Sequence, residues 1–212
     1  MPLGPYFAVE RWDPAAPWRP FADLALDPVT LAERVEVAAA VLERTGPVSR
    51  RVVASVYSLG VVSRLVSPVF AAAVLDGEVP VLSLDTVGWQ PVTTGPMPIA
   101  YRQGVEKVGA SAAAIVEGCI EPTVKPFLTT LGDRYRVSPR VLWGNAASAV
   151  GGAYTMLKHE NAGPLVADLL ARPPLIGLAT WNGRALKRRN CCLFYRIPGA
   201  GTCGDCVLNR EP

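Results

Sequence analysis

The sequence has 212 residues, of which 50% are hydrophobic and 18% are charged, with a formal net charge of +3. This length suffices to bury a core without disulfides or a metal, and the small net charge argues against nucleic acid as a partner, because nucleic-acid-binding proteins usually carry a long basic stripe. Its 20 prolines and 19 glycines are spread along the chain, so low-complexity disorder is excluded as well.

The first 27 residues contain five prolines and predict an irregular segment. Its aromatic side chains are expected to anchor it to the core: Tyr6, Phe7, Trp12, Trp18 and Phe21. The segment lacks the basic start, long apolar run and small-residue cleavage site of a secretion signal. We therefore expect a cytoplasmic protein, in which cysteine thiols stay reduced.

Two helices are expected next. Asp27 is a good N-cap and Pro28 suits the first position of a helix that should run to about Arg44. A second helix, from about Val48 to Leu75, has apolar residues at three- and four-residue spacing. Its central Arg64 would cost a membrane-spanning helix at least about 2.5 kcal/mol. We therefore expect a buried amphipathic helix whose arginine snorkels to water or forms an ion pair.

The middle of the chain predicts mixed structure. Residues 79–92 alternate and predict a strand or hairpin with a turn near residues 85–88, and residues 94–98 predict a loop. A short strand is expected around residues 112–116. Three helices should follow, over residues 121–131, 138–158 and 163–172, the middle one capped by Ser138. A strand at residues 175–180 would lie in the connector after them.

These elements predict an α+β fold, a mainly helical single domain with a small β element. Within it, residues 1–183 would form the scaffold and residues 184–212 a cysteine-rich C-terminal segment. We expect the scaffold to carry the substrate-binding surface, but the sequence does not locate it.

The C-terminal segment contains four of the five cysteines in a C-C-x10-C-x2-C pattern: Cys191, Cys192, Cys203 and Cys206. Such a set can hold a tetrahedral zinc ion, hold a [2Fe-2S] cluster, or form two disulfides. Cys203 and Cys206 form the turn that zinc sites use, but adjacent cysteines in extended chain point to opposite faces. The pattern favours a two-iron cluster over zinc, and zinc over disulfides. The remaining cysteine, Cys119, is expected to be a small buried apolar residue.

Positive charge is concentrated beside these cysteines. Residues 184–212 carry six basic and two acidic residues, a net charge of +4, whereas the rest of the chain carries −1. Arg188, Arg189 and Arg196 are candidates to tune a cluster's potential or to contact a partner, since positive charge stabilises the more negative reduced state. The alternative is an ordinary solvated surface.

The stretch Arg188–Arg196, followed by Cys203–Cys206, resembles the C-terminal signature of the FhuF-like ferric siderophore reductases. Residues 141–148 resemble the middle region of that family more loosely. The resemblance implies that Cys191, Cys192, Cys203 and Cys206 ligate a [2Fe-2S] cluster.

The resemblance further implies an oxidoreductase that reduces siderophore-bound Fe(III) to Fe(II) and so releases iron in the cytoplasm. The alternatives are a [2Fe-2S] electron carrier to another protein, and a non-redox protein with a structural four-cysteine zinc tail. No G-x-G-x-x-G fingerprint follows a strand, so a separate electron-donor protein is expected. No catalytic residue is assigned beyond the cluster ligands. A peripheral contact with the inner membrane, where siderophores arrive, is a further hypothesis.

Overall fold

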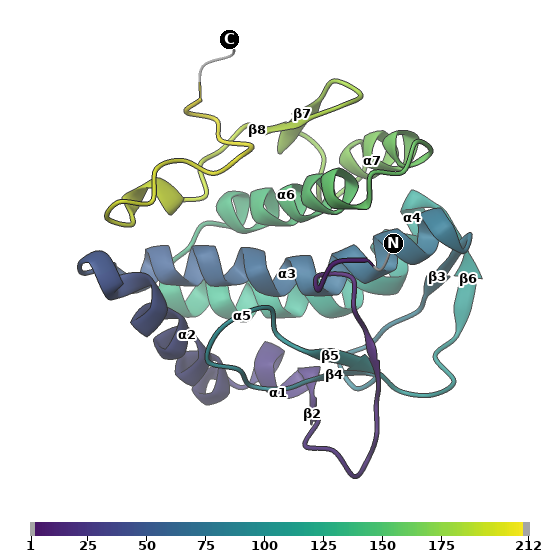
Figure 1. Cartoon of the computed structure of the whole chain (residues 1–212), viewed down its shortest axis with the longest axis horizontal. Helices are drawn as coiled ribbons and strands as arrows, with labels where there is room; N and C mark the ends of the chain where they lie inside the picture. Colours follow the sequence, from purple (N-terminus) through teal and green to yellow (C-terminus); the bar gives the residue numbers. More distant parts are fainter. Residues whose placement is uncertain (1–2, 210–212) are drawn as a thin grey trace.

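The computed structural model describes residues 3–209 and is built around one long central helix, α3 (Arg50–Leu75). Helix α6 (Pro139–Leu157) packs along one side of α3, and α7 (Ala162–Leu170) packs on α6. Helices α2 (Pro28–Leu42) and α5 (Lys125–Tyr135) contact α3 as well (Figure 1). The fold is mainly helical with small sheets, which confirms the predicted α+β class.

The capping signals predicted two of these helices well. The Asp27 carboxylate accepts hydrogen bonds from the backbone N–H groups of Val29 and Thr30 and so begins α2. Ser138 accepts a weaker bond of 3.4 Å from the N–H of Val141 at the start of α6. A short 3-10 turn, Glu43–Thr45, closes α2 before Gly46.

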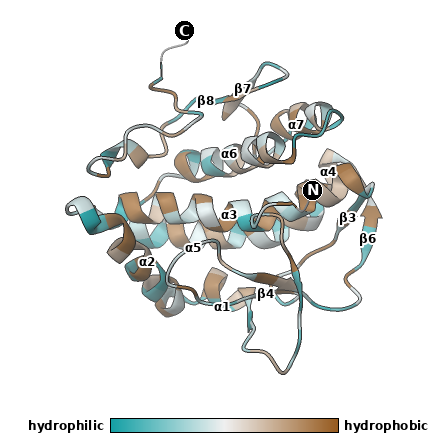
Figure 2. Ribbon diagram, in the orientation of Figure 1, coloured by the Kyte–Doolittle hydropathy of each residue, from teal (hydrophilic) through white to brown (hydrophobic). Residues whose placement is uncertain are grey.

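Hydrophobic residues, brown in Figure 2, occur on all the packed helices and on the strands that lie against them. The core includes Phe21, Phe70 and Phe127, which are fully buried. Burial of this apolar surface is the main force that holds the helices together.

The strands are short. The larger sheet has the order β1-β5-β4-β2, with β1 (Glu10–Arg11) parallel to β5 (Ile99–Tyr101) and the other pairs antiparallel. Its remaining strands are β4 (Val87–Trp89) and β2 (Arg19–Pro20). Strands β3 (Glu78–Pro80) and β6 (Lys107–Gly109) form a separate antiparallel pair.

Of the prediction of a strand or hairpin over residues 79–92, the strands are confirmed and the hairpin pairing was wrong. The two ends of this stretch, β3 and β4, belong to different sheets, and each pairs with a strand from residues 99–109. Alternation within one stretch reveals strands but not their partners, since pairing is set by contacts distant in sequence.

The predicted strand at residues 112–116 is helical. Ser111 caps α4 (Ala112–Ile115), which continues without a break through a π-helical stretch, Val116–Val124, into α5. The helix expected to start near residue 121 therefore starts earlier and contains Pro122. Proline interrupts the ordinary α-helical ladder, and the chain passes it in wider π turns.

The N-terminal segment is pinned to the core as expected, although it is less irregular. Phe7, Trp12 and Phe21 are buried, and Tyr6 and Trp18 are half-buried. Besides β1 and β2, it contains α1 (Phe21–Leu26). Between β1 and β2, the indole of Trp12 lies so close to Gly88 that a Cβ there would lie 2.7 Å from it.

Arg64 neither snorkels nor forms an ion pair, contrary to expectation. Its side chain is 3% exposed and donates to three backbone carbonyls, those of Pro5 at 2.6 Å, Ala8 at 2.7 Å and Met97 at 2.7 Å. Burial lowers the pKa of Arg64. The guanidinium fork thus joins the N-terminal segment and the loop before β5 to the middle of α3.

Helix α3 is the only helix of the described residues that is long and apolar enough to cross a membrane, and two thirds of its most apolar window is buried inside the protein. Such burial is what a core helix shows. At the C-terminal end, β7 (Ala179–Trp181) and β8 (Leu186–Arg188) form a hairpin, so the expected division at residue 184 lies at the hairpin's turn.

We expect Arg64→Met to lower the free energy of unfolding by about 3 kcal/mol or more, because three buried carbonyls lose a charged donor. Urea denaturation measures this loss. The matched control is Arg51→Met, since Arg51 lies on the same helix and is exposed. Equal stability of the two variants would contradict a structural role for the Arg64 contacts.

Candidate functional site

The segment after β8 runs irregularly across α3 and α6 and contains one 3-10 turn, Phe194–Arg196. In Figure 1 it is the yellow chain above these two helices. Leu193 adopts a left-handed conformation with φ of 70°, and Gly199 and Gly201 have φ of 78° and 72°. These positions let the chain reverse direction between the two cysteine pairs.

A buried polar network joins this segment to the helices. The Ser55 hydroxyl donates to the carbonyl of Cys192 at 2.7 Å. The Asn145 side-chain amide donates to the carbonyl of Ser55 at 2.7 Å and to the hydroxyl of Ser58 at 2.9 Å. All three side chains are fully buried. Buried polar groups are costly unless paired, so this network fixes where Cys192 lies.

Arg188 is a second anchor. It is 2% exposed, and its guanidinium donates to the carbonyls of Asn190 at 3.1 Å and Val141 at 3.3 Å. Its backbone N–H donates to the carbonyl of Asp205 at 3.0 Å. This one residue therefore contacts α6 and both cysteine-bearing stretches.

Two glycines of α6 permit this close approach. A Cβ at Gly144 would lie 2.6 Å from Asn190 Nδ2 and 2.8 Å from Arg188 Nη2. A Cβ at Gly151 would lie 2.9 Å from the Cβ of Leu186. Any larger residue would push the C-terminal segment away from the helix.

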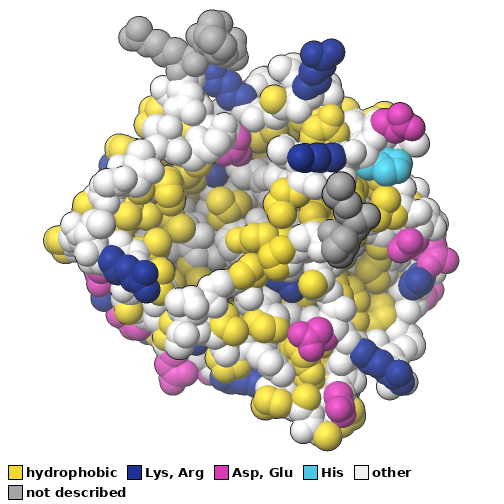
Figure 3. Space-filling model, in the orientation of Figure 1, with side chains coloured by type: hydrophobic (Ala, Val, Ile, Leu, Met, Phe, Trp, Pro, Cys, Tyr) yellow, Lys and Arg dark blue, Asp and Glu magenta, His cyan; other side chains and the backbone are white. Residues whose placement is uncertain are grey.

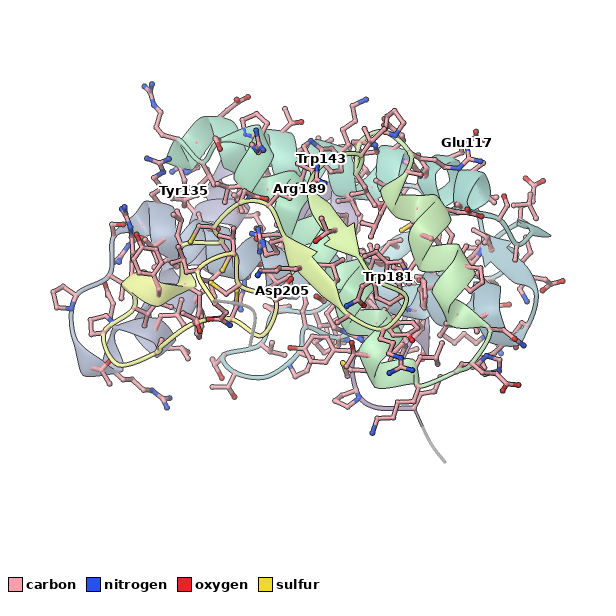
Figure 4. The ribbon with its side chains drawn as sticks, turned by 90° about the horizontal axis from the view of Figure 1, so that it is seen from above. Glu117, Tyr135, Trp143, Trp181, Arg189 and Asp205 are labelled. Carbon is pink, nitrogen blue, oxygen red and sulfur yellow. The ribbon has the colours of Figure 1, made fainter. Side chains whose placement is uncertain are left out.

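The thiols gather in this segment, where Figure 4 shows yellow sulfur atoms among its loops. The Sγ atoms of Cys192 and Cys203 lie 3.4 Å apart. Cys192 and Cys206 are buried, whereas Cys191 and Cys203 are half-buried. All five cysteines of the chain are free thiols in this structure.

Backbone amides point at two of the sulfurs. The N–H of Leu193 donates to Cys191 Sγ at 3.3 Å, and the N–H of Leu208 donates to Cys206 Sγ at 3.4 Å. Each donor lies two residues after its cysteine. Bonds of this kind stabilise a negatively charged thiolate and orient it.

The turn from Cys203 to Cys206 is held from both sides. The N–H of Cys206 donates to the carbonyl of Cys203 at 3.2 Å. The Ser148 hydroxyl on α6 donates a short hydrogen bond to the Asp205 carboxylate. Burial, then the neighbouring Cys192 thiol and the Asp205 carboxylate, raise the pKa of Cys203.

Two features of this arrangement, one close pair of thiols and two unpaired buried donors, suit a negatively charged cluster. Two thiolates on one tetrahedral metal lie about 3.8 Å apart for metal–sulfur bonds of about 2.3 Å, close to the separation of Cys192 and Cys203. Arg188 Nη1 and Asn190 Nδ2 are buried donors without a partner among the described residues. Within residues 3–209, no three or more His, Cys, Asp or Glu side chains are grouped so that they could hold a metal ion.

The other predicted arginines lie on the surface. Arg189 and Arg196 are exposed, and the Arg196 guanidinium stacks 5.7 Å from the ring centre of Tyr195. The Tyr195 hydroxyl, as hydrogen-bond partner, raises the pKa of Arg196. Arg210 and Glu211, which contribute to the local charge, lie outside the described residues. A role of these arginines in tuning a potential stays a prediction.

Helices α3 and α6 contribute further residues to the site. The sequence did not single these residues out. Ser55 and Ser58 carry no motif, and their spacing shows only that they share a face of α3. Asn145 and Ser148 had one signal, since they lie in the stretch that resembles the middle of the FhuF-like family. Cys119 is fully buried, as expected, and burial raises its pKa to about 12.

Comparison with known families gives a match over the C-terminal segment. The model described as the FhuF 2Fe-2S C-terminal domain matches residues 188–208. The matched range contains the four cysteines and Arg188, and it supports a [2Fe-2S] cluster as the cofactor. No curated protein matches this sequence.

Similar folds occur in two solved structures of the aerobactin synthetase IucA from a hypervirulent pathotype of Klebsiella pneumoniae, one of them ATP-bound. Their TM-scores are 0.57 and 0.58, each at 11% sequence identity. They cover 75% and 76% of this chain, which spans about a third of theirs (32% and 33%). At this identity the likeness is one of fold alone.

We expect Gly144→Ala to displace Arg188 and Asn190 and thereby reduce the iron retained per chain, at a cost of about 1–3 kcal/mol from overpacking. Gly152→Ala on the same helix is the matched control, because a Cβ there meets nothing within 4 Å. That variant should retain iron and be as stable as the wild type or more stable by up to about 1 kcal/mol. Iron analysis after gel filtration and urea denaturation measure both. Equal iron retention in the two variants would show that the close contact at Gly144 does not hold the segment.

Proposed function

We propose that this protein is a ferric-siderophore reductase. Its C-terminal segment matches an iron–sulfur domain model, and the four thiols lie on a segment that is hydrogen-bonded to α3 and α6. The observation that carries the proposal is the C-C-x10-C-x2-C set, which matches that model at residues 188–208 and is anchored to α3 and α6.

In this proposal the [2Fe-2S] cluster is ligated by Cys191, Cys192, Cys203 and Cys206, and when bound it supplies one-electron transfer. Ser55 and Asn145 orient Cys192, and Ser148 orients the Cys203–Cys206 turn through Asp205. The N–H groups of Leu193 and Leu208 stabilise the thiolates. The buried Arg188 stabilises additional negative charge on the site.

The substrate chemistry needs one electron and no general base. Siderophores bind Fe(III) through hard oxygen donors, which hold the larger and less charged Fe(II) less well. One electron converts the bound Fe(III) to Fe(II), which then leaves the intact siderophore for other ligands. That electron comes from a separate one-electron donor protein. We further propose that this takes place in the cytoplasm, with peripheral contact at the inner membrane.

Two other functions remain to be tested against this one. An electron carrier would use the same cluster but would pass its electron to another protein. A structural zinc tail would use the same thiols without redox chemistry.

We expect anaerobically purified protein to be reddish brown and to contain about two irons and two sulfides per chain. Cys192→Ser should lose most of this iron and the visible absorption, because it removes a ligand. Cys119→Ala should keep both, since Cys119 lies in the core outside the site. A colourless wild type with one zinc, or full iron content in Cys192→Ser, would refute the cluster assignment.

Chemically reduced protein should reduce a ferric siderophore in a single turnover. The measurement follows reoxidation in the visible spectrum while a chelator traps Fe(II). One Fe(II) per reduced protein is expected. If the protein stays reduced in the presence of every ferric siderophore but is reoxidised by an acceptor protein, the electron-carrier function replaces the proposed one.

A further inference from the structure

A groove runs between α3 and α6 and ends at the turn that carries Cys203. It has a volume of about 650 Å³, within the range of pockets that hold small molecules. Its lining includes Gly60, Ser63, Ser148, Gly152, Cys203 and Asp205. Figure 3 shows a hollow on this face, lined mostly by hydrophobic and uncharged side chains.

Small residues at helical spacing create the groove. On α3, Gly60, Ser63 and Ser67 recur at three- and four-residue intervals and so share one face. On α6, Ser148 and Gly152 do the same. A Cβ added at Gly60 or at Gly152 would meet nothing within 4 Å, so the space beside both walls is open.

Of the four clustered cysteines, Cys203 lines the groove. Cys203 lines the groove and is half-buried, whereas its close neighbour Cys192 is buried and Cys191 does not line it. A molecule in the groove would therefore lie against Cys203 and Gly204. Gly204 presents no side chain there, and a Cβ at that position would meet nothing within 4 Å.

The charged residues that line the groove determine which net charge a bound molecule can have. No lysine or arginine is among the described residues that line the groove, and Asp205 is the only carboxylate among them. Hydroxyl groups come from Tyr6, Ser63 and Thr155, among others. Such a lining disfavours a strongly anionic molecule and accepts a neutral or positively charged one with apolar arms.

We propose that this groove is the docking site for the ferric chelate, and that it takes chelates of zero or positive net charge with the metal end toward Cys203. The proposal rests on the reductase function proposed for this protein. Gly60 and Gly152 are the binding residues that leave room for the chelate, and Asp205 sets its charge preference.

The test separates binding from reduction by using gallium(III) chelates, because gallium(III) has the charge and nearly the size of Fe(III) but is not reduced under these conditions. Equilibrium dialysis measures the Kd of a gallium tris-hydroxamate with a protonated amine, which is singly positive. Gly60→Phe and Gly152→Phe fill the groove from opposite walls. Each should raise the Kd at least about tenfold, with iron content unchanged.

Gly109→Phe is the control, since Gly109 lies on β6, is exposed and also has open space at its Cβ position. It should leave the Kd unchanged. If Gly60→Phe and Gly152→Phe both bind the gallium chelate as the wild type does, the groove is not the docking site, even if the wild type reduces ferric chelates. If the wild type binds no gallium chelate, the groove proposal fails as well.

The charge preference has its own measurement. A triply negative gallium tris-catecholate should bind the wild type at least about tenfold more weakly than the singly positive chelate. Equal affinity for the two would overturn the assigned preference. Failure of the reductase function itself would appear separately, as binding of the gallium chelate without single-turnover reduction of its iron counterpart.

Discussion

The hydrogen bonds of Asn145 decide where the C-terminal segment lies. Its side chain is fully buried between α3 and α6, where Oδ1 has no partner among the described residues. The NH2 group must find acceptors there, because an unpaired donor in this core would cost several kcal/mol. It finds them in Ser55 and Ser58, and Ser55 in turn donates to the carbonyl of Cys192. The hydrogen bonds that join α3 to α6 thus also position Cys192, a predicted cluster ligand. Core packing and the position of Cys192 depend here on one network.

Much of the helical architecture could be predicted from local signals, because caps such as Asp27 and Ser138 act within a single turn. Features that depend on distant contacts could not. Strands β3 and β4 pair with strands that lie later in the chain. Arg64 donates to carbonyls of residues that come before and after α3 in the sequence. The helix through Pro122 was missed for another reason, since proline usually marks a start and here lies within π turns.

The candidate site divides in the same way. Four cysteines at a defined spacing are visible in the sequence, and their chemistry limits what they can hold. The residues that support them are ordinary in type: a serine, an asparagine and glycines such as Gly144, whose value lies only in what touches them. Arg188 looked like one member of a basic patch, but it is buried against α6, unlike the exposed Arg189. A count of charges does not distinguish the buried Arg188 from the exposed Arg189, because burial depends on the fold.

Arg64 also has a consequence for the order in which the chain folds. Its three acceptors come from residues 5, 8 and 97, which flank α3 on both sides in sequence. During synthesis the N-terminal segment leaves the ribosome first, yet its anchor is made later, and the third acceptor later still. The N-terminal segment therefore cannot dock until the centre of α3 and the loop before β5 have both been synthesised. A single guanidinium then closes three parts of the chain at once, which makes the docking of the N-terminal segment a late and cooperative event.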